Sequence, residues 1–173
     1  MNIRKATDKD IKNIHQIYLQ AFADEEAELV SGVAIELLRQ SNKQNNLNFV
    51  AIEDQKIIGH IALSPVSIGS GCAGHILAPL AVDPRFQKQG VGSQLVKHSL
   101  SILKNRQTNI VFVYGDPKYY SRFGFSVKAA NNYPPPYSLE YEQGWQAVIF
   151  QKCRAESSQK LIFVPALQNP ALW

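Results

Sequence analysis

The sequence lacks the usual features of membrane, secreted and nucleic-acid-binding proteins. It contains no run of 18 apolar residues, so we expect no transmembrane helix. The first residues lack the apolar core of a signal peptide. The formal net charge is +4, but no block of lysine and arginine is long enough for a nucleic-acid-binding arm. These absences predict a soluble cytoplasmic protein with no membrane and no nucleic-acid partner.

Cysteine is also scarce, which limits the chemistry that the chain can support. The two cysteines, Cys72 and Cys153, lie far apart in the sequence and form no metal-binding or redox motif. We therefore expect two free thiols and no metal site.

The composition is that of a globular domain. Of 173 residues, 45% are hydrophobic and 18% are charged, which predicts a single domain over residues 1–173. Residues 1–128 are expected to form its core. Residues 129–173 are expected to add a C-terminal hairpin, with strands at 145–150 and 161–164. A proline-rich segment, Tyr133–Tyr137, precedes that hairpin as either a linker or a lid.

Hydrophobic periodicity predicts alternating strands and helices. Thr7-x-x-Asp10 is a capping box that starts the first helix, and residues 53–56 form a hairpin turn. Residues 41–46 are a polar break, and residues 64–74 are a loop or an irregular strand end. The predicted strands are 3–6, 49–52, 57–63, 76–82 and 109–114, and the predicted helices cover 11–22, 27–38 and 90–103.

The most informative motif is the segment 87–92, Gln-Lys-Gln-Gly-Val-Gly, between the strand at 76–82 and the helix at 90–103. A glycine-rich turn that opens a helix presents unpaired backbone N–H groups, and the helix dipole adds positive potential at the same place. This arrangement predicts a binding site for a phosphate or pyrophosphate.

Two common phosphate-binding signatures do not fit this segment. A Walker A loop requires Lys-Ser/Thr after its second glycine, whereas Gly92 is followed by Ser93 and Gln94. A dinucleotide fingerprint requires a third small residue and an acid about 20 residues later. Leu95 occupies the first of these positions, and the apolar strand 110–113 occupies the second.

A third signature does fit: Gln87-x-x-Gly90-x-Gly92 resembles the Q/R-x-x-G-x-G/A loop of the GNAT acetyltransferase superfamily. A second block supports this resemblance. Residues 115–125 read Gly-Asp-Pro-Lys-Tyr-Tyr-Ser-Arg-Phe-Gly-Phe and contain the Tyr-x-x-x-Gly-Phe pattern that begins at Tyr120. The longer block is similar to that of a subgroup of bacterial predicted N-acetyltransferases. The resemblance covers about residues 1–127.

The resemblance implies an α/β fold with a mixed, mostly antiparallel central sheet flanked by helices. Two parallel central strands, ending at Val82 and Tyr114, would splay apart around the pantetheine arm of acetyl-CoA. The implied cofactor-binding residues supply strand backbone, loop amides and packing or charged side chains near the phosphates. They are Leu80, Ala81, Val82, Gln87, Lys88, Gln89, Gly90, Val91, Gly92, Ser93, Tyr119 and Arg122.

The implied activity is acetyl transfer to a primary amine by direct attack in a ternary complex. Tyrosine stays protonated at neutral pH because its pKa is about 10, so Tyr120 is our candidate acid for the leaving thiolate. A backbone N–H near Ala81 or Val82 is the candidate oxyanion donor. No general base identifies itself: His60 and His75 are more typical of structural histidines.

The sequence does not determine the role of three acidic residues or the identity of the acceptor. Glu25, Glu26 and Glu28 either border the acceptor site or form a solvated face. The acceptor is a small molecule or a peptide that carries an amine, and the protein is a monomer or a homodimer. The alternatives are a non-catalytic CoA-binding sensor of the same fold and a nucleotide-binding domain of another class.

Overall fold

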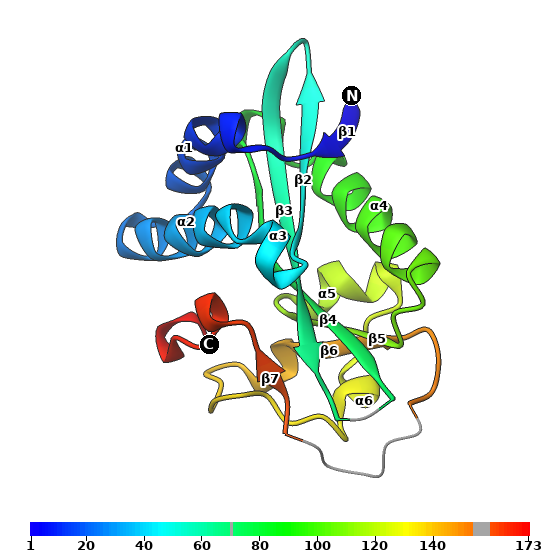
Figure 1. The fold of residues 1–173 in the computed structure, drawn as a ribbon. Helices are drawn as coiled ribbons and strands as arrows, with labels where there is room; N and C mark the ends of the chain where they lie inside the picture. Colours follow the sequence, from blue (N-terminus) through cyan, green and yellow to red (C-terminus); the bar gives the residue numbers. More distant parts are fainter. Residues whose placement is uncertain (70, 154–159) are drawn as a thin grey trace. The chain divides into compact units, whose positions relative to one another are not determined.

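A computed structural model describes residues 1–69, 71–153 and 160–173 (Figure 1). Within these ranges it contains a seven-stranded mixed sheet with the order β1-β2-β3-β4-β5-β6, and β7 pairs with β3. The strands are β1 (Asn2–Lys5), β2 (Leu47–Glu53), β3 (Lys56–Ser67), β4 (Ala73–Val82), β5 (Ile110–Tyr114), β6 (Trp145–Ile149) and β7 (Ile162–Phe163).

The helices are interleaved with these strands. The α-helices are α1 (Ile11–Ala21), α2 (Asp24–Arg39), α3 (Ser41–Gln44), α4 (Val91–Asn105), α5 (Pro117–Tyr120) and α6 (Val127–Ala130). Short 3-10 turns are η1 (Asp8–Asp10), η2 (Pro84–Phe86), η3 (Ser121–Phe123), η4 (Glu142–Gly144), η5 (Pro165–Leu167) and η6 (Pro170–Leu172). The predicted order of strands and long helices up to β5 is confirmed.

The internal contacts of the chain divide it into two compact units. The first consists of Met1–Leu63 and Ala78–Leu100, and the second of Ser64–Leu77 and Ser101–Trp173. Strands β3 and β4 and helix α4 each contribute residues to both units. That the whole chain forms one domain stays a prediction.

The first unit is built on an antiparallel meander. β1 pairs with β2 from Asn2 opposite Ile52, and the β2–β3 hairpin closes with Glu53 opposite Lys56. The two turn residues, Asp54 and Gln55, both have positive φ, at 47° and 64°. Positive φ at both central positions is the geometry that suits the right-handed twist of a two-residue hairpin. The hairpin predicted from the polar residues 53–56 is thus confirmed.

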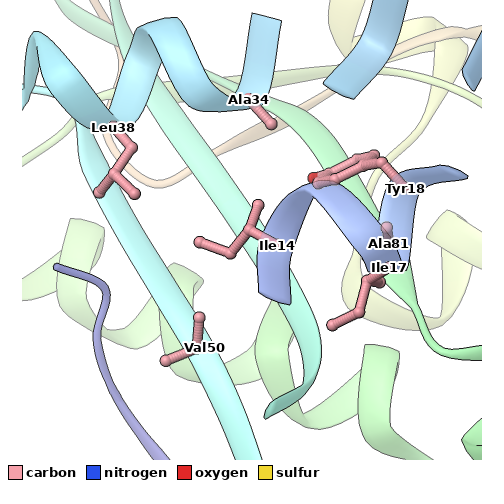
Figure 2. Close-up of a cluster of buried hydrophobic side chains, with 7 residues drawn as sticks. All are labelled: Ile14, Ile17, Tyr18, Ala34, Leu38, Val50 and Ala81. Carbon is pink, nitrogen blue, oxygen red and sulfur yellow. The ribbon is translucent and has the colours of Figure 1, made fainter. Parts of the chain in front are cut away.

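Helices α1 and α2 cover one face of this meander and bury a common core (Figure 2). Apolar residues recur at helical spacing along both helices, so one stripe of each faces inward. Burial of each large aliphatic side chain contributes about 1.5–3 kcal/mol. The buried cluster comprises Ile14, Ile17, Tyr18, Ala34, Leu38, Val50 and Ala81.

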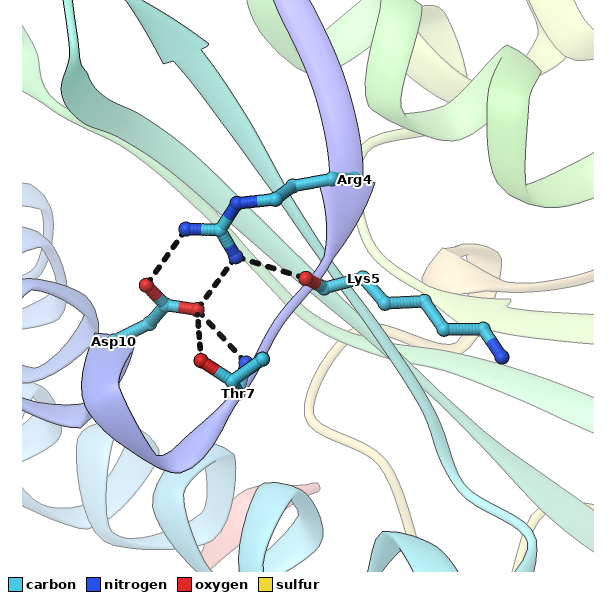
Figure 3. A network of polar contacts seen from close by, with 4 residues as sticks. All are labelled: Arg4, Lys5, Thr7 and Asp10. Atoms are coloured by element: carbon cyan, nitrogen blue, oxygen red, sulfur yellow. Dashed lines mark hydrogen bonds and ion pairs between the residues drawn. The ribbon is translucent and has the colours of Figure 1, made fainter.

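A buried carboxylate fixes the start of α1 (Figure 3). Asp10 accepts two hydrogen bonds from the Arg4 guanidinium, at 2.7 and 2.8 Å, and two more from the N–H and hydroxyl of Thr7. The hydrogen bonds from Arg4 outweigh the cost of burial and lower the pKa of Asp10 to about 2. This confirms the helix start predicted at Thr7-x-x-Asp10.

The second unit contains the parallel pair. Gly74–Ile76 of β4 lies in parallel register with Ile110–Phe112 of β5, which confirms the predicted parallel strands. β6 runs antiparallel to β5 along its length, from Ile149 opposite Ile110 to Trp145 opposite Tyr114.

The predicted C-terminal hairpin is wrong. β6 pairs with β5, whereas β7 pairs with β3, where Phe163 lies opposite Val66. Hydrophobic alternation predicts a strand but does not identify the strand with which it pairs. Two strands that follow each other in the sequence therefore need not pair with each other. Two boundaries also differ: part of the polar break forms α3, and β3 and β4 extend into residues 64–74, of which Ser70 lies outside the described residues.

The expectation of two free thiols is also wrong, because Cys72 and Cys153 form a disulfide with a Cα–Cα distance of 5.1 Å. Asn109 explains how residues so far apart in sequence meet. Its N–H donates to Ala73 O, and its carbonyl accepts from Phe150 N–H, both at 2.8 Å. These bonds hold the start of β4 beside the segment after β6.

A buried polar network crosses the core of the first unit. The Tyr18 hydroxyl lies 3.0 Å from His60 Nδ1, and His60 Nε2 lies 3.3 Å from Asn48 Oδ1. The amide nitrogen of Asn48 donates to Leu37 O and Ser41 Oγ, so its oxygen faces the histidine. His60 is fully buried, and burial lowers its pKa to about 3 despite the opposing charge of Asp10. His60 is therefore a neutral structural residue.

This network predicts acid-sensitive stability. Below pH 6.5, His60 takes up a proton in the unfolded chain but not in the folded one, so stability should fall from there towards about pH 3. The expected contribution is about 1.4 kcal/mol per pH unit. Half-buried His75, with a pKa lowered to about 4, should add to the loss in the same direction. Urea unfolding of the wild type and of His60→Gln between pH 7 and pH 4 would measure this loss of stability. The variant should show a shallower pH dependence, and equal slopes would contradict the assignment.

Candidate active site

The loop after β4 is held at its first residue. The Asp83 N–H donates to Ile58 O at 3.0 Å, which ties the end of β4 to β3. The Asp83 carboxylate accepts from the backbone N–H of Arg85 at 2.9 Å and from its guanidinium at 2.7 Å. The Arg85 hydrogen bond holds the pKa of this buried carboxyl below its usual value. Asp83 thus caps η2 and sets the direction in which the chain leaves the strand.

The turn itself is closed by glutamine side chains. Gln87 Nε2 donates to Val82 O at 3.1 Å, and Gln89 Nε2 donates to Arg85 O at 2.9 Å. Lys88 and Gly90 have positive φ, at 60° and 88°. Glycine is needed most at Gly90, since this backbone conformation is costly for other residues. Both glutamine side chains therefore stabilise the shape of the loop.

The backbone N–H groups that follow are the ones available to a ligand. The first hydrogen bond of α4 runs from Gln94 N–H to Gly90 O at 3.0 Å. The N–H groups of Val91, Gly92 and Ser93 therefore have no carbonyl of the helix to pair with. They point out of the helix at the positive end of its dipole, which is a suitable site for an anion.

Close packing holds this helix end against the sheet. A Cβ at Gly59 on β3 would lie 3.1 Å from side-chain atoms of both Val91 and Leu95. Glycine at this position lets the first turn of α4 approach the strand closely. On the same sheet, the side chain of Ala81 belongs to the buried core, so Ala81 has only its backbone to offer a ligand. The parallel register of β4 with β5 ends at Ile76, six residues before β4 itself ends.

The second group of predicted residues follows β5. Asp116 caps the short helix α5 by accepting from Lys118 N–H at 2.9 Å, and Pro117 occupies the first helical position. This helix carries Tyr119 and Tyr120. The Tyr120 ring lies over Gly115, where a Cβ would come within 2.6 Å of its Cε2. The ring also meets those of Tyr119 and Phe125 edge-on, at 4.9 and 5.7 Å between centroids.

The surroundings of Tyr120 keep its phenol protonated. Desolvation, followed by the neighbouring Tyr119, raises the pKa of Tyr120 well above its ordinary value. Within the described residues, its hydroxyl makes no hydrogen bond. The phenol is therefore neutral at pH 7 and free to donate.

Arg122 makes contacts with Tyr119 that the sequence did not indicate. Its Nε donates to Tyr119 O at 3.1 Å, and its guanidinium carbon lies 4.5 Å from the centre of the Tyr119 ring. Such a stack steadies both side chains. Contact of Arg122 with a phosphate stays a prediction.

None of the candidate bases gains support. His60 belongs to the buried network described above. His75 pairs with Val111 near the start of the parallel register, away from the strand end that carries Tyr120, and its Nδ1 lies 3.2 Å from Thr108 Oγ1. Burial, followed by the charge of Arg106, lowers its pKa to about 4. The acidic residues on α2 are solvent-exposed: Glu25, Glu26 and Glu28.

Sequence reasoning missed the partners that hold Gly115 in place. The Gly115 N–H donates to Gly144 O at 3.0 Å, and Gly115 O accepts from buried Gln146 Nε2 at 3.1 Å. These residues lie about 30 positions further along the chain and belong to no motif. Only the β5–β6 register, which the sequence did not predict, reveals them.

Within the described ranges, no group of three or more histidine, cysteine, aspartate or glutamate residues is arranged to hold a metal ion. In the same ranges, no helix combines the length and apolar character that crossing a membrane requires.

The fold is that of an acyltransferase. The acetyltransferase (GNAT) domain family matches residues 2–128, and the chain belongs to this family. The uncharacterized N-acetyltransferase YjhQ of Escherichia coli K12 is 34% identical over 142 residues, covering 79% of this chain and 76% of the relative. The uncharacterized N-acetyltransferase YhbS of the same strain is 41% identical over 85 residues, covering 48% of this chain and 51% of that protein.

Solved structures agree with this assignment. The E. coli GNAT family N-acetyltransferase YhbS, in complex with CoA, has a TM-score of 0.79 at 26% identity and covers 97% of this chain and 92% of its own. A GNAT family acetyltransferase from Brucella melitensis, in complex with acetyl-CoA, has a TM-score of 0.74 at 27% identity, with coverage of 95% and 96%. The predicted α/β fold with its parallel central pair is therefore confirmed.

Proposed function

We propose that this protein transfers the acetyl group of acetyl-CoA to a primary amine by direct attack within a ternary complex. The observation that carries the proposal is the start of α4, where the N–H groups of Val91, Gly92 and Ser93 lack helical acceptors. A pyrophosphate supplies the acceptors that these donors require. The CoA and acetyl-CoA complexes of the two structural relatives support the same ligand for this chain.

The course of the chain supports the remaining proposed cofactor contacts. Leu80–Val82 lies in β4 beyond its parallel register with β5, so its backbone is suited to pair with an extended pantetheine arm. Lys88 is exposed beside the loop amides, where its charge would favour a phosphate. The ring of Tyr119, steadied by Arg122, would pack against the ligand.

The reaction requires the protein to stabilise an oxyanion and to protonate the leaving sulfur. The amine nitrogen forms a bond to the thioester carbonyl carbon, the carbon–sulfur bond breaks, and the products are an amide and the CoA thiol. A backbone N–H near Ala81 or Val82 would stabilise the developing oxyanion. Tyr120 would donate its proton to the departing sulfur and regain one as the attacking nitrogen loses its proton to solvent. The phenol is protonated at neutral pH, so its proton is present when the thiolate forms.

The acid role predicts that Tyr120→Phe lowers kcat about 100-fold or more, because only the hydroxyl is removed. The Kd for acetyl-CoA should change little. Thiol release during amine acetylation measures the rate, and calorimetry measures the affinity. Tyr119→Phe is the matched control, since it removes a hydroxyl one residue away and should keep most of the activity. Equal loss of turnover and cofactor affinity in Tyr120→Phe would rule out a specific acid role.

The loop role predicts that Gly92→Glu weakens acetyl-CoA binding at least about tenfold, because a carboxylate would lie among the phosphate-binding amides. Ser101→Glu adds the same charge at an exposed position further along α4 and serves as control. Calorimetric titration of both variants, after circular dichroism has confirmed folding, tests the assignment. Unchanged affinity in folded Gly92→Glu would overturn it.

A further inference from the structure

A cavity of about 440 Å³ lies entirely within the second unit, between α6, the segment Tyr133–Leu139, η4 and the start of β6. Its volume falls within the range of small-molecule sites. Val127, Leu139 and Trp145 contribute apolar surface, and Glu142 supplies the only charge among its described lining residues.

Contacts within the protein hold the walls of this cavity in place. The Trp145 ring stacks on Phe112, with centroids 5.2 Å apart and planes 3° apart, and its Nε1 donates to Tyr133 O at 2.8 Å. The Tyr137 hydroxyl donates to Gln168 O, so the segment is attached at both ends. Three consecutive prolines, 134–136, restrict the backbone between these attachments. The segment therefore forms a rigid wall of this cavity. Its role as a linker or as a rigid lid over the acceptor pocket stays a prediction.

The chemistry of the lining favours an organic cation. Trp145 is 4% exposed and one face of its ring is stacked on Phe112, so it contributes little free surface. The Tyr137 hydroxyl is bonded to a backbone carbonyl, so half-buried Tyr137 and Tyr133 offer mainly their aromatic surfaces. Aromatic faces attract cations. Glu142 is exposed and forms no ion pair within the described residues, so its carboxylate is available to an ammonium group.

The cavity lies at the strand end that carries Tyr120. Trp145 is opposite Tyr114, the last residue of β5, so their side chains share a face of the sheet. The next residue, Gly115, faces the other way, and the Tyr120 ring lies over it. Gly115 is bonded to Gly144, which ends the turn that carries Glu142. The cavity and the acid thus lie at one strand end, on opposite faces.

From this arrangement we infer that the cavity is the acceptor site, and that it takes a primary amine with an apolar or aromatic body whose ammonium group pairs with Glu142. The inference rests on the proposed acetyl transfer and names its substrate class. The bound ammonium first releases one proton to solvent, and the neutral amine then approaches the end of β5 from the face opposite Tyr120. The nucleophile and the proton for the leaving sulfur then come from opposite sides.

The test compares amines that carry the same charge but differ in the group attached to the nitrogen. Thiol release from acetyl-CoA is measured with 2-phenylethylamine, hexylamine and ethanolamine. We expect the first two to exceed ethanolamine at least about tenfold in kcat/KM, because only they fill the apolar lining. Glu142→Gln should raise KM for 2-phenylethylamine about tenfold with a smaller change in kcat, since a charge-assisted hydrogen bond is lost. Val127→Trp, at a site 39% exposed, should block the cavity without disturbing the core.

Glu140→Gln is the matched control, because Glu140 is an exposed acid two residues away that does not line the cavity. It should leave KM unchanged. If Glu142→Gln behaves like Glu140→Gln, or if ethanolamine is used as well as 2-phenylethylamine, the acceptor assignment is wrong while acetyl transfer stands. If acetyl-CoA does not bind the wild type, the proposed function itself fails. Binding of 2-phenylethylamine, followed by tryptophan fluorescence, should be lost in Val127→Trp, and retained binding would overturn the site.

Discussion

The chemistry of the second unit depends on how the end of β5 is held at Gly115. Its N–H is bonded to Gly144, the last residue of η4, and its carbonyl to Gln146 on β6. Its missing side chain leaves the space that the Tyr120 ring occupies. One residue therefore positions the proposed acid on one face and, through η4, the carboxylate of Glu142 near the other. A side chain here would displace the acid even though it touched no substrate.

The proposed anion site in the first unit depends on a different set of constraints. Gly59 allows α4 to lie close to β3, Asp83 directs the chain out of β4, and Gly90 supplies the left-handed turn before the helix. None of these residues needs to contact a ligand. Together they keep a helix end open, with N–H groups that a phosphate can satisfy. The sequence motif therefore describes the shape of a backbone more than a set of side-chain contacts.

Much of the fold and the loop could be predicted because they depend on local patterns. Helical spacing gave α1, α2 and α4, and the Gly90-x-Gly92 turn marked the helix start directly. The rest depends on pairing between distant segments. The disulfide, the separate partners of β6 and β7, and the bonds from Gly144 and Gln146 to Gly115 join residues that share no motif. The sequence left open whether the proline-rich segment covers a pocket, because the cavity depends on contacts of Trp145 with distant residues.

The most direct test of the central claim is a calorimetric titration of the purified protein with acetyl-CoA, with ATP and NAD as competing phosphate ligands. If the start of α4 binds the CoA pyrophosphate and the neighbouring strand backbone pairs with pantetheine, as proposed, acetyl-CoA binds saturably and the two nucleotides give little heat. The absence of binding at about millimolar acetyl-CoA, equivalent to a binding free energy weaker than about −4 kcal/mol, would contradict the account. Equal binding of all three ligands would reduce the loop to a general phosphate site.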